Sequence, residues 1–208
     1  MSMNDSRYGI IAELKIQDGK MEEVIGLAQG HFKRQLDGRE PNATGAAILK
    51  PLADEPNMLR FWEQWKTKED YDVHAAPNDN LKVFFDSAGP HLDGAPNLIV
   101  TPMEHFEKQA TPGQKYGILV EVTVKDGKME DFMKLAREHF QRQLDGREVN
   151  ATLASISMPN SEHPNTLLFF EQWETQADYD PAHTGSENLK VFFGAAECLF
   201  ADVSLKEF

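Results

Sequence analysis

Short segments rich in β-branched and aromatic residues mark the expected strands of this chain. Residues 8–16 and 116–124 are two such segments, and each is followed closely by an Asp-Gly pair, a combination typical of strand ends. After each pair, apolar residues recur at helical spacing as far as about Leu36 and Leu144, which predicts an amphipathic helix. Further strands are expected at residues 43–50, 58–65 and 98–106 in the first half and at 151–158, 166–173 and 199–205 in the second.

The second half of the chain repeats the first. The segment HFKRQLDGREPNAT, which begins at His31, returns as HFQRQLDGREVNAT at His139, an offset of 139 − 31 = 108 residues. A period of this size matches a complete small domain rather than the repeat of a solenoid. We therefore expect a first domain at residues 1–107, a linker at 108–115 and a second domain at 116–208.

Each half has the same expected order of elements: strand, helix, strand, strand, helix, strand. Asp18 and Asp126 are expected to cap the longer helices, and Thr67 and Thr175 each begin a capping box for a shorter one. This order predicts the α+β class, with two tandem ferredoxin-like βαββαβ domains. A sheet covered by helices on one face leaves its other face to a partner sheet, so we expect an internal pseudo-dimer.

The third strand of each half carries a carboxylate among apolar residues. Alternation places Phe61, Glu63 and Trp65 on one face, and Glu171 is the matching residue of the second copy. If such a carboxyl group is buried, its pKa rises, which suits a proton acceptor. Alternatively, each glutamate forms an ion pair. The candidate partners are Arg34 and Arg142.

Aromatic residues and a histidine follow each of these strands. Trp65 closes the strand and is followed by Tyr71 and His74, which together can form the aromatic wall of a pocket for a planar ligand. The histidine titrates in a range that suits a base. The alternative is a tryptophan in the core and a histidine on the surface. The second copy has Trp173, Tyr179 and His183 in these places. Because the repeat slips by one residue before His183, we expect the two sites to differ there.

The repeated block that starts at His31 and His139 is richer in polar residues than a helix end and a turn require. In the first copy these residues are Arg34, Gln35, Asp37, Arg39, Glu40 and Asn42. A charge network at the pseudo-dimer interface is the favoured interpretation. A shared pocket wall and a recent duplication with little drift are the alternatives.

Composition narrows the classes of function. The 208 residues carry a formal charge of −13, which disfavours nucleic acids and anionic membranes as partners. Cys198 is the single cysteine and no signal-peptide pattern opens the sequence, so the cytoplasm is the expected compartment. No Gly-rich phosphate loop or HExxH motif occurs. We accordingly expect no metal and no organic cofactor.

Two longer motifs resemble those of the antibiotic biosynthesis monooxygenase superfamily. They are FWEQWKTKEDYD at residues 61–72 and FFEQWETQADYD at residues 169–180, and each is followed by a histidine and then by LKVFF. The resemblance implies a dimeric α+β barrel, here formed within one tandem chain. It also implies a pocket in each copy, lined by Trp65 with His74 and by Trp173 with His183.

The resemblance implies a function as well. Members of this superfamily include cofactor-independent oxygenases of phenols, and we expect a monooxygenase that oxidises a small aromatic, quinol-like substrate with O₂. Glu63, His74, Glu171 and His183 are the candidate catalytic residues, and Trp65, Tyr71, Trp173 and Tyr179 are the candidate substrate-binding residues. The rival hypotheses are a non-catalytic, stress-associated module that binds a small ligand, and an isomerase. Further homo-oligomerisation of the fused chain is open.

Overall fold

The computed structural model describes residues 5–49, 51–76, 78–107, 114–161 and 163–207. The chain divides into two compact units, an N-terminal unit at Ser6–Pro102 and a C-terminal unit that contains Met103–Phe208. This division falls within strand β4 (Asn97–Glu107), a few residues before the end that the sequence predicts for the first domain. Most of the expected linker, residues 108–113, lies outside the described residues.

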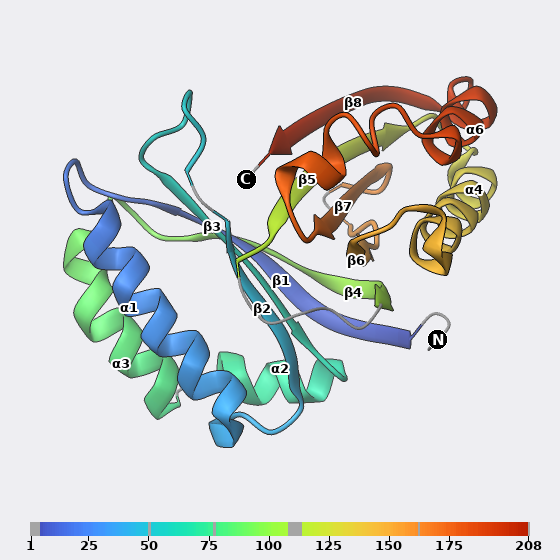
Figure 1. Cartoon of the computed structure of the whole chain (residues 1–208). Coiled ribbons are helices and arrows are strands. Elements are labelled where there is room, and N and C mark those ends of the chain that lie inside the picture. Colours follow the sequence, from blue (N-terminus) through green and yellow to red (C-terminus); the bar gives the residue numbers. More distant parts are fainter. Residues whose placement is uncertain (1–4, 50, 77, 108–113, 162, 208) are drawn as a thin grey trace. The chain divides into compact units, whose positions relative to one another are not determined.

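The N-terminal unit is a small antiparallel sheet covered by helices (Figure 1). Its elements are β1 (Asp5–Lys15), α1 (Met21–Arg34), η1 (Gln35–Arg39), β2 (Ala43–Leu49), β3 (Met58–Trp65), α2 (Lys68–Ala75), α3 (Asp79–Ala88), η2 (Gly89–His91) and the first part of β4. Strand β3 lies between β2 and β1 and is antiparallel to both. Glu63 on β3 is opposite Ile10 of β1 and Ala46 of β2.

The C-terminal unit repeats this arrangement. Its elements are β5 (Tyr116–Val124), α4 (Met129–Arg142), η3 (Gln143–Arg147), β6 (Ala151–Ser157), β7 (Thr166–Trp173), α5 (Gln176–Tyr179), α6 (Glu187–Ala196) and β8 (Phe200–Glu207). Strand β7 pairs with β6 and β5, and β5 also pairs with β8. Glu171 is opposite Ile118 of β5 and Ala154 of β6. The predicted α+β class with two tandem βαββαβ units is confirmed.

Each unit has its own core between its helices and its sheet. Phe32 of α1 packs edge-on against Phe61 of β3, and Phe140 of α4 packs in the same way against Phe169 of β7. Strand alternation therefore turns Phe61 and Glu63, or Phe169 and Glu171, toward the helices. The apolar core of each unit thus surrounds the glutamate of its third strand.

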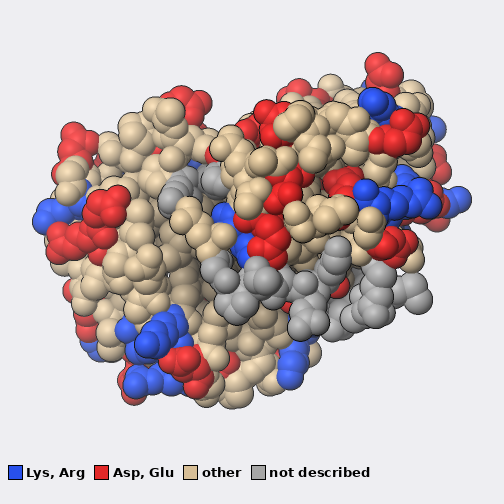
Figure 2. All heavy atoms as spheres, in the orientation of Figure 1, with Lys and Arg blue, Asp and Glu red and all other residues tan. Residues whose placement is uncertain are grey.

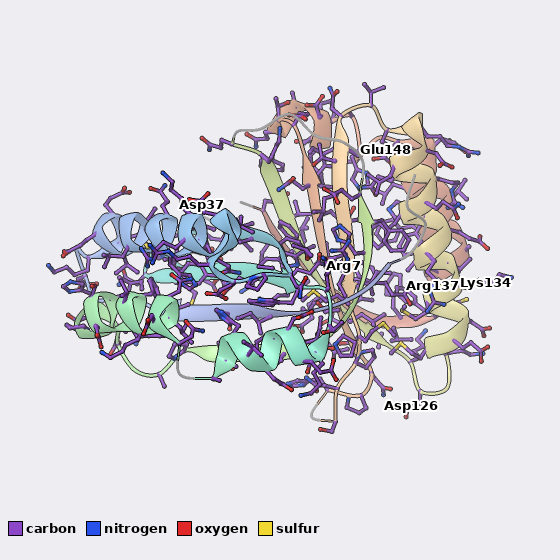
Figure 3. The ribbon with its side chains drawn as sticks, turned by 90° about the horizontal axis from the view of Figure 1, so that it is seen from below. Arg7, Asp37, Asp126, Lys134, Arg137 and Glu148 are labelled. Carbon is purple, nitrogen blue, oxygen red and sulfur yellow. The ribbon has the colours of Figure 1, made fainter. Side chains whose placement is uncertain are left out.

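The predicted N-terminal caps of the helices are only partly confirmed. Helix α2 begins as predicted, because the Thr67 hydroxyl accepts a hydrogen bond of 3.2 Å from the backbone N–H of Asp70. The predicted capping by Asp18 and Asp126 is wrong, since α1 and α4 begin without a side-chain cap. Instead, Asp18 accepts a hydrogen bond of 2.5 Å from Asn57, which ties the turn after β1 to the turn before β3. Figure 3 shows Asp126 in the corresponding loop before α4.

Charged side chains of both signs are distributed over the surface. In the face shown in Figure 2, carboxylate groups are scattered over both units with lysine and arginine side chains between them. Within the described residues, the helices are all too short or too polar to cross a membrane.

Candidate active site

A pocket of about 130 Å³ lies between the sheet and the helices of the N-terminal unit. Most of its lining is apolar and comes from β1, β3 and α3, with Ile10 and Phe84 as examples. Three buried polar side chains interrupt this lining: His31 of α1, Glu63 of β3 and His74 of α2. An apolar pocket with a few convergent polar groups is the usual form of a small-molecule site.

The C-terminal unit has the equivalent pocket, with a volume of about 250 Å³. Its lining is again mostly apolar, and Phe169 and Phe192 belong to it. The polar side chains in this lining include His139, Glu171 and His183, all of them buried. The same three residue types thus face a pocket in each unit.

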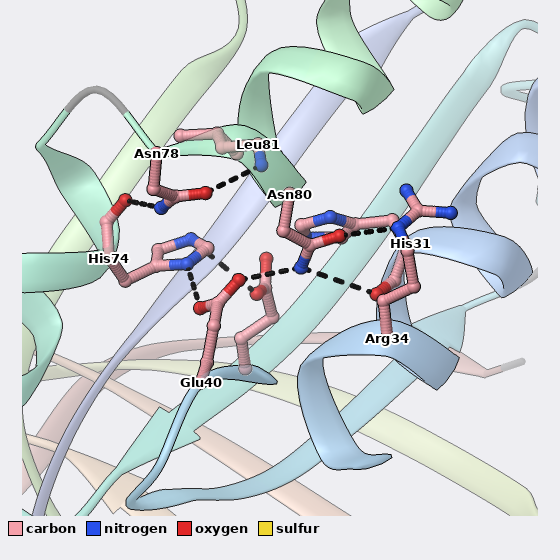
Figure 4. Close-up of polar contacts among 8 residues, drawn as sticks. His31, Arg34, Glu40, His74, Asn78, Asn80 and Leu81 are labelled. Atoms are coloured by element: carbon pink, nitrogen blue, oxygen red, sulfur yellow. Dashed lines mark hydrogen bonds and ion pairs between the residues drawn. The ribbon is translucent and has the colours of Figure 1, made fainter. Parts of the chain in front are cut away.

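A chain of hydrogen bonds fixes the His74 ring (Figure 4). Its Nδ1 bonds to one carboxylate oxygen of Glu40, and the other oxygen of Glu40 accepts a hydrogen bond of 2.6 Å from the Asn80 amide. The Asn80 oxygen in turn accepts 2.8 Å from Nε of Arg34. Asn78 adds a backbone anchor, because its amide donates to the carbonyl oxygen of His74 over 2.5 Å. The ring therefore has one defined orientation.

The same chain of hydrogen bonds occurs in the C-terminal unit. Nδ1 of His183 lies 2.5 Å from Glu148, which also accepts a hydrogen bond of 2.8 Å from Asn188, and Asn188 accepts 2.8 Å from Arg142. His74 lies within helix α2, whereas His183 lies in the loop after the four-residue helix α5. The expected difference between the two histidines is thus wrong for their contacts, since the loop compensates for the slip in register.

The direction of these bonds sets the tautomer of each histidine. Burial raises the pKa of Glu40, but hydrogen bonds from His74 and Asn80 and the electrostatic effect of His74 outweigh it, and the pKa is lowered. An ionised Glu40 can only accept, so Nδ1 of His74 carries the proton. In the neutral form of the ring, Nε2 is then the free acceptor, and it lies 4.0 Å from Oε2 of Glu63. His74 therefore presents a proton acceptor toward the glutamate of the pocket.

The two pocket glutamates are strongly perturbed. Burial raises the pKa of Glu63 and that of Glu171 to about 7, against the opposing effects of the neighbouring histidine charge and of Gln35 or Gln143. Among the described residues, no hydrogen bond reaches Oε2 of either glutamate. Arg34 and Arg142 bond to asparagines instead. Each glutamate can therefore take up or release a proton near neutral pH.

His31 and His139 are site residues that the sequence interpretation missed. Burial lowers the pKa of each to about 4, so both imidazoles are neutral near pH 7. They lie on the buried face of α1 and α4, together with Phe32 and Phe140. A signal was present, because His31 follows Val24 and Ala28 at helical spacing on that face.

The aromatic residues predicted for substrate binding take different places. Tyr71 and Tyr179 are among the residues that line the two pockets. Trp65 instead packs against the His74 ring, with centroids 4.5 Å apart, and lines a separate outer cleft that also contains Glu40. Trp173 packs on His183 at 4.8 Å. In this arrangement the tryptophans support the histidines.

The repeated polar block has a local structural role within each unit. Gly38 and Asn42 adopt left-handed φ angles of 91° and 77°, which glycine and asparagine tolerate better than other residues. The resulting turn between α1 and β2 carries Glu40 to His74. Figure 3 shows Glu148 at the corresponding end of α4. This contact matches the pocket-wall alternative for Glu40, which was not the favoured interpretation.

Comparison with known proteins identifies the fold. No family model matches the sequence, and no curated protein matches it. A proposed monooxygenase from Lactobacillus acidophilus is similar in structure, with a TM-score of 0.83 and 17% identity over 97% of this chain and 92% of that one. A proposed monooxygenase from Fusobacterium nucleatum gives 0.82 and 13% over 97% and 90%. An anthrone oxidase-like protein gives 0.59 and 12% over 100% and 91%. The chain therefore has the tandem α+β fold of these monooxygenase-like structures, as its resemblance to the antibiotic biosynthesis monooxygenase superfamily implied.

Proposed function

We propose that the pocket of each unit is a cofactor-independent monooxygenase site that oxidises a small phenolic substrate with O₂. The observation that carries this proposal is the convergence of a buried carboxyl group and an oriented imidazole on one apolar pocket, Glu63 with His74 and Glu171 with His183. The similar structures support it, since two are named as proposed monooxygenases and a third as anthrone oxidase-like.

The reaction begins with loss of the phenolic proton. Nε2 of His74 accepts this proton directly, or Glu63 accepts it, and the two acceptors lie 4.0 Å apart on the same pocket. The resulting phenolate is rich in electrons and reacts with O₂ at a ring carbon. One oxygen atom becomes the second carbonyl of a quinone, and the other leaves as water with the two hydrogens that the substrate loses. The substrate supplies all the electrons, so the balance needs no reductant.

The apolar lining has a chemical role in this scheme. The lining excludes water from the phenolate. The electrostatic interactions between the phenolate and the neighbouring polar groups are therefore stronger, because the local dielectric constant is low. Tyr71 and Tyr179, which line the pockets, can donate a hydrogen bond to a substrate oxygen.

Oxygen uptake by metal-free protein tests the proposal. We expect chelator-treated protein to consume O₂ with members of a phenol and hydroquinone panel, one O₂ for each quinone formed from a phenol. Heat-denatured protein is the control for spontaneous oxidation. Uptake no faster than this control with the whole panel would refute an oxygenase. Ligand-linked thermal stabilisation without turnover would then favour a binding module, and substrate isomerisation without uptake would favour an isomerase.

The two pockets should select substrates by size. A dry cavity of about 150 Å³ holds benzene, so the pocket of about 130 Å³ fits one ring and the pocket of about 250 Å³ fits a larger system. We expect Glu171→Gln to abolish turnover of three-ring phenols while single-ring turnover continues at the N-terminal site. Glu63→Gln should retain three-ring turnover. Steady-state rates for both substrate classes check this, and equal loss of three-ring turnover in the two variants would contradict it.

A further inference from the structure

Three potential metal ligands meet in the pocket of each unit. One ligand atom each from His31, Glu63 and His74 lie within 4.8 Å of one another, and the three side chains are all buried. The C-terminal unit repeats the cluster. Its members are His139, Glu171 and His183. Because the three residues come from two helices or loops and one strand, sequence spacing gave no sign of the cluster.

The cluster contains buried polar atoms that have no hydrogen-bond partner among the described residues. Nδ1 of His31 and Oε2 of Glu63 are buried and accept or donate no hydrogen bond there, and Nδ1 of His139 and Oε2 of Glu171 are in the same state. Burial of an unpaired polar atom is unfavourable. A bound species that these atoms contact would remove the penalty in both units.

The surroundings of His74 and His183 are those of metal-binding histidines. A histidine that binds a metal usually gives its other ring N–H to a carboxylate, which fixes the tautomer and orients the free nitrogen. Glu40 and Glu148 supply that carboxylate through Nδ1. In the N-terminal unit, Nε2 of His74 is the nitrogen nearer to Glu63.

We propose that each His-Glu-His cluster binds one divalent transition-metal ion, giving two ions per chain. Two imidazoles and a carboxylate form a ligand set for Zn²⁺ or Fe²⁺. The ring centroids lie 6.0 Å apart for His31 and His74 and 5.9 Å apart for His139 and His183. With Zn–N bonds of about 2.1 Å and a tetrahedral angle, two imidazoles on one ion have centroids roughly 5.3 Å apart, so the two rings must also approach each other slightly.

The ligand atoms must come closer when the ion binds. Ligand atoms on a tetrahedral Zn²⁺ are roughly 3.3 Å apart, whereas Oε2 of Glu63 is 4.0 Å from Nε2 of His74. The Glu63 carboxyl can turn toward the imidazoles without losing a hydrogen bond at Oε2, because no described residue donates to that atom. The three side chains also line the pocket, so a small molecule in the pocket would lie beside the ion.

Metal binding and the proposed oxidation are separate claims on the same groups. A bound ion occupies Glu63 and His74, which the metal-free reaction needs as proton acceptors. The two claims can therefore fail independently. Protein that consumes O₂ without metal and binds none overturns only the metal site, and protein that binds metal but shows no metal-free uptake overturns only the proposed function.

Metal content after Zn²⁺ loading provides the test. Chelator-treated protein is incubated with excess Zn²⁺ at pH 7.5, desalted and analysed for zinc, and Co²⁺ absorption in the visible range reports the coordination. We expect two Zn²⁺ per chain for the wild type, one for Glu63→Gln and none for Glu63→Gln/Glu171→Gln. His91→Ala, which removes a surface histidine paired with Glu23, should retain two.

A second double variant controls for a folding defect in the glutamine variants. His31→Asn/His139→Asn removes two ligands whose Nδ1 atoms have no hydrogen-bond partner in the described residues. The hydrogen bond from Asn80 to residue 31 goes to the backbone carbonyl, which the substitution keeps. We expect this folded protein to bind no Zn²⁺ after desalting. A wild type that retains no zinc, or double variants that retain two ions, would overturn the proposal.

Discussion

Replacing Glu63 and Glu171 together by glutamine is expected to lower kcat/KM for phenol oxidation by at least about 100-fold, the usual lower bound for a general base. Glutamine keeps the size of the side chain but cannot take up a proton. Each site then loses the carboxyl group that faces the pocket beside His74 or His183, and only the carboxylate on the Nδ1 side of the imidazole remains. Initial rates of O₂ uptake across pH 5 to 9 give the measurement.

The stability of the same double variant relative to the wild type should increase as the pH rises. The pKa of each buried carboxyl group is about 7 in the folded protein, against 4.5 for an ordinary glutamate. Between these two values the folded protein binds more protons than the unfolded chain, so wild-type stability falls as pH rises through this window. The loss is about 3 kcal/mol for each carboxyl group. The variant lacks this loss, so its advantage in free energy of unfolding should grow between pH 4.5 and pH 7.

Denaturant unfolding at pH 5 and pH 8 separates this effect from a general change in packing. The difference between variant and wild type is compared at the two pH values, so a constant cost of the substitution cancels. Glu69→Gln/Glu130→Gln, which alters two exposed glutamates at helix starts, should show neither the activity loss nor the pH-dependent gain. Unchanged activity together with a flat stability difference would contradict a proton-accepting role for Glu63 and Glu171.

The fold could be predicted from the sequence because the patterns that indicate its strands and helices are local and occur in both halves. Alternation along β3 and β7 predicts which residues face the core, and it placed Glu63 and Glu171 there. A carboxylate between apolar strand neighbours is informative because its burial has a free-energy cost that an apolar side chain would avoid. The repeat supports these predictions, because the same pattern of apolar and polar residues occurs at equivalent positions in both halves.

The chain of hydrogen bonds from Arg34 to His74 could not be predicted from the sequence, because it depends on contacts between segments that are far apart in the chain. Glu40 meets Asn80 and His74 only through the left-handed turn at Gly38. Polar residues in a repeated block look the same whether they face a partner domain or a pocket. The sequence therefore left the role of Glu40 open between these alternatives.

The one-residue slip before His183 led to the wrong prediction that the two histidine sites differ, and the cause is again structure that the sequence does not show. A shift of one residue changes the face of a side chain within a regular helix, but here the second copy leaves its helix at Tyr179. The loop that follows returns the imidazole to the carboxylate, and His183 contacts Glu148 as His74 contacts Glu40. Register arguments hold only where the secondary structure is the same in both copies.

Replacing Glu40 and Glu148 by glutamine is expected to reverse the histidine tautomer and to lower kcat/KM by about 10- to 100-fold, the loss that is usual when a metal-binding histidine loses a partner of this kind. The Asn80 oxygen accepts from Arg34, so its amide must donate toward residue 40. The single oxygen of glutamine goes to that amide, and its NH₂ group faces Nδ1 of His74. Nδ1 must then accept, so the ring proton moves to Nε2.

A proton on Nε2 removes the acceptor that faces the pocket, and this consequence distinguishes a positioning role from a structural one. Imidazole ¹⁵N chemical shifts should report protonated Nδ1 in the wild type and protonated Nε2 in the Glu40→Gln/Glu148→Gln variant. Glu40→Asp/Glu148→Asp retains two carboxylate oxygens, so it should keep the wild-type tautomer and more of the activity. If the glutamine variant keeps protonated Nδ1 and full turnover, the carboxylates do not set the state of His74 and His183, and proton acceptance by these histidines loses its structural basis.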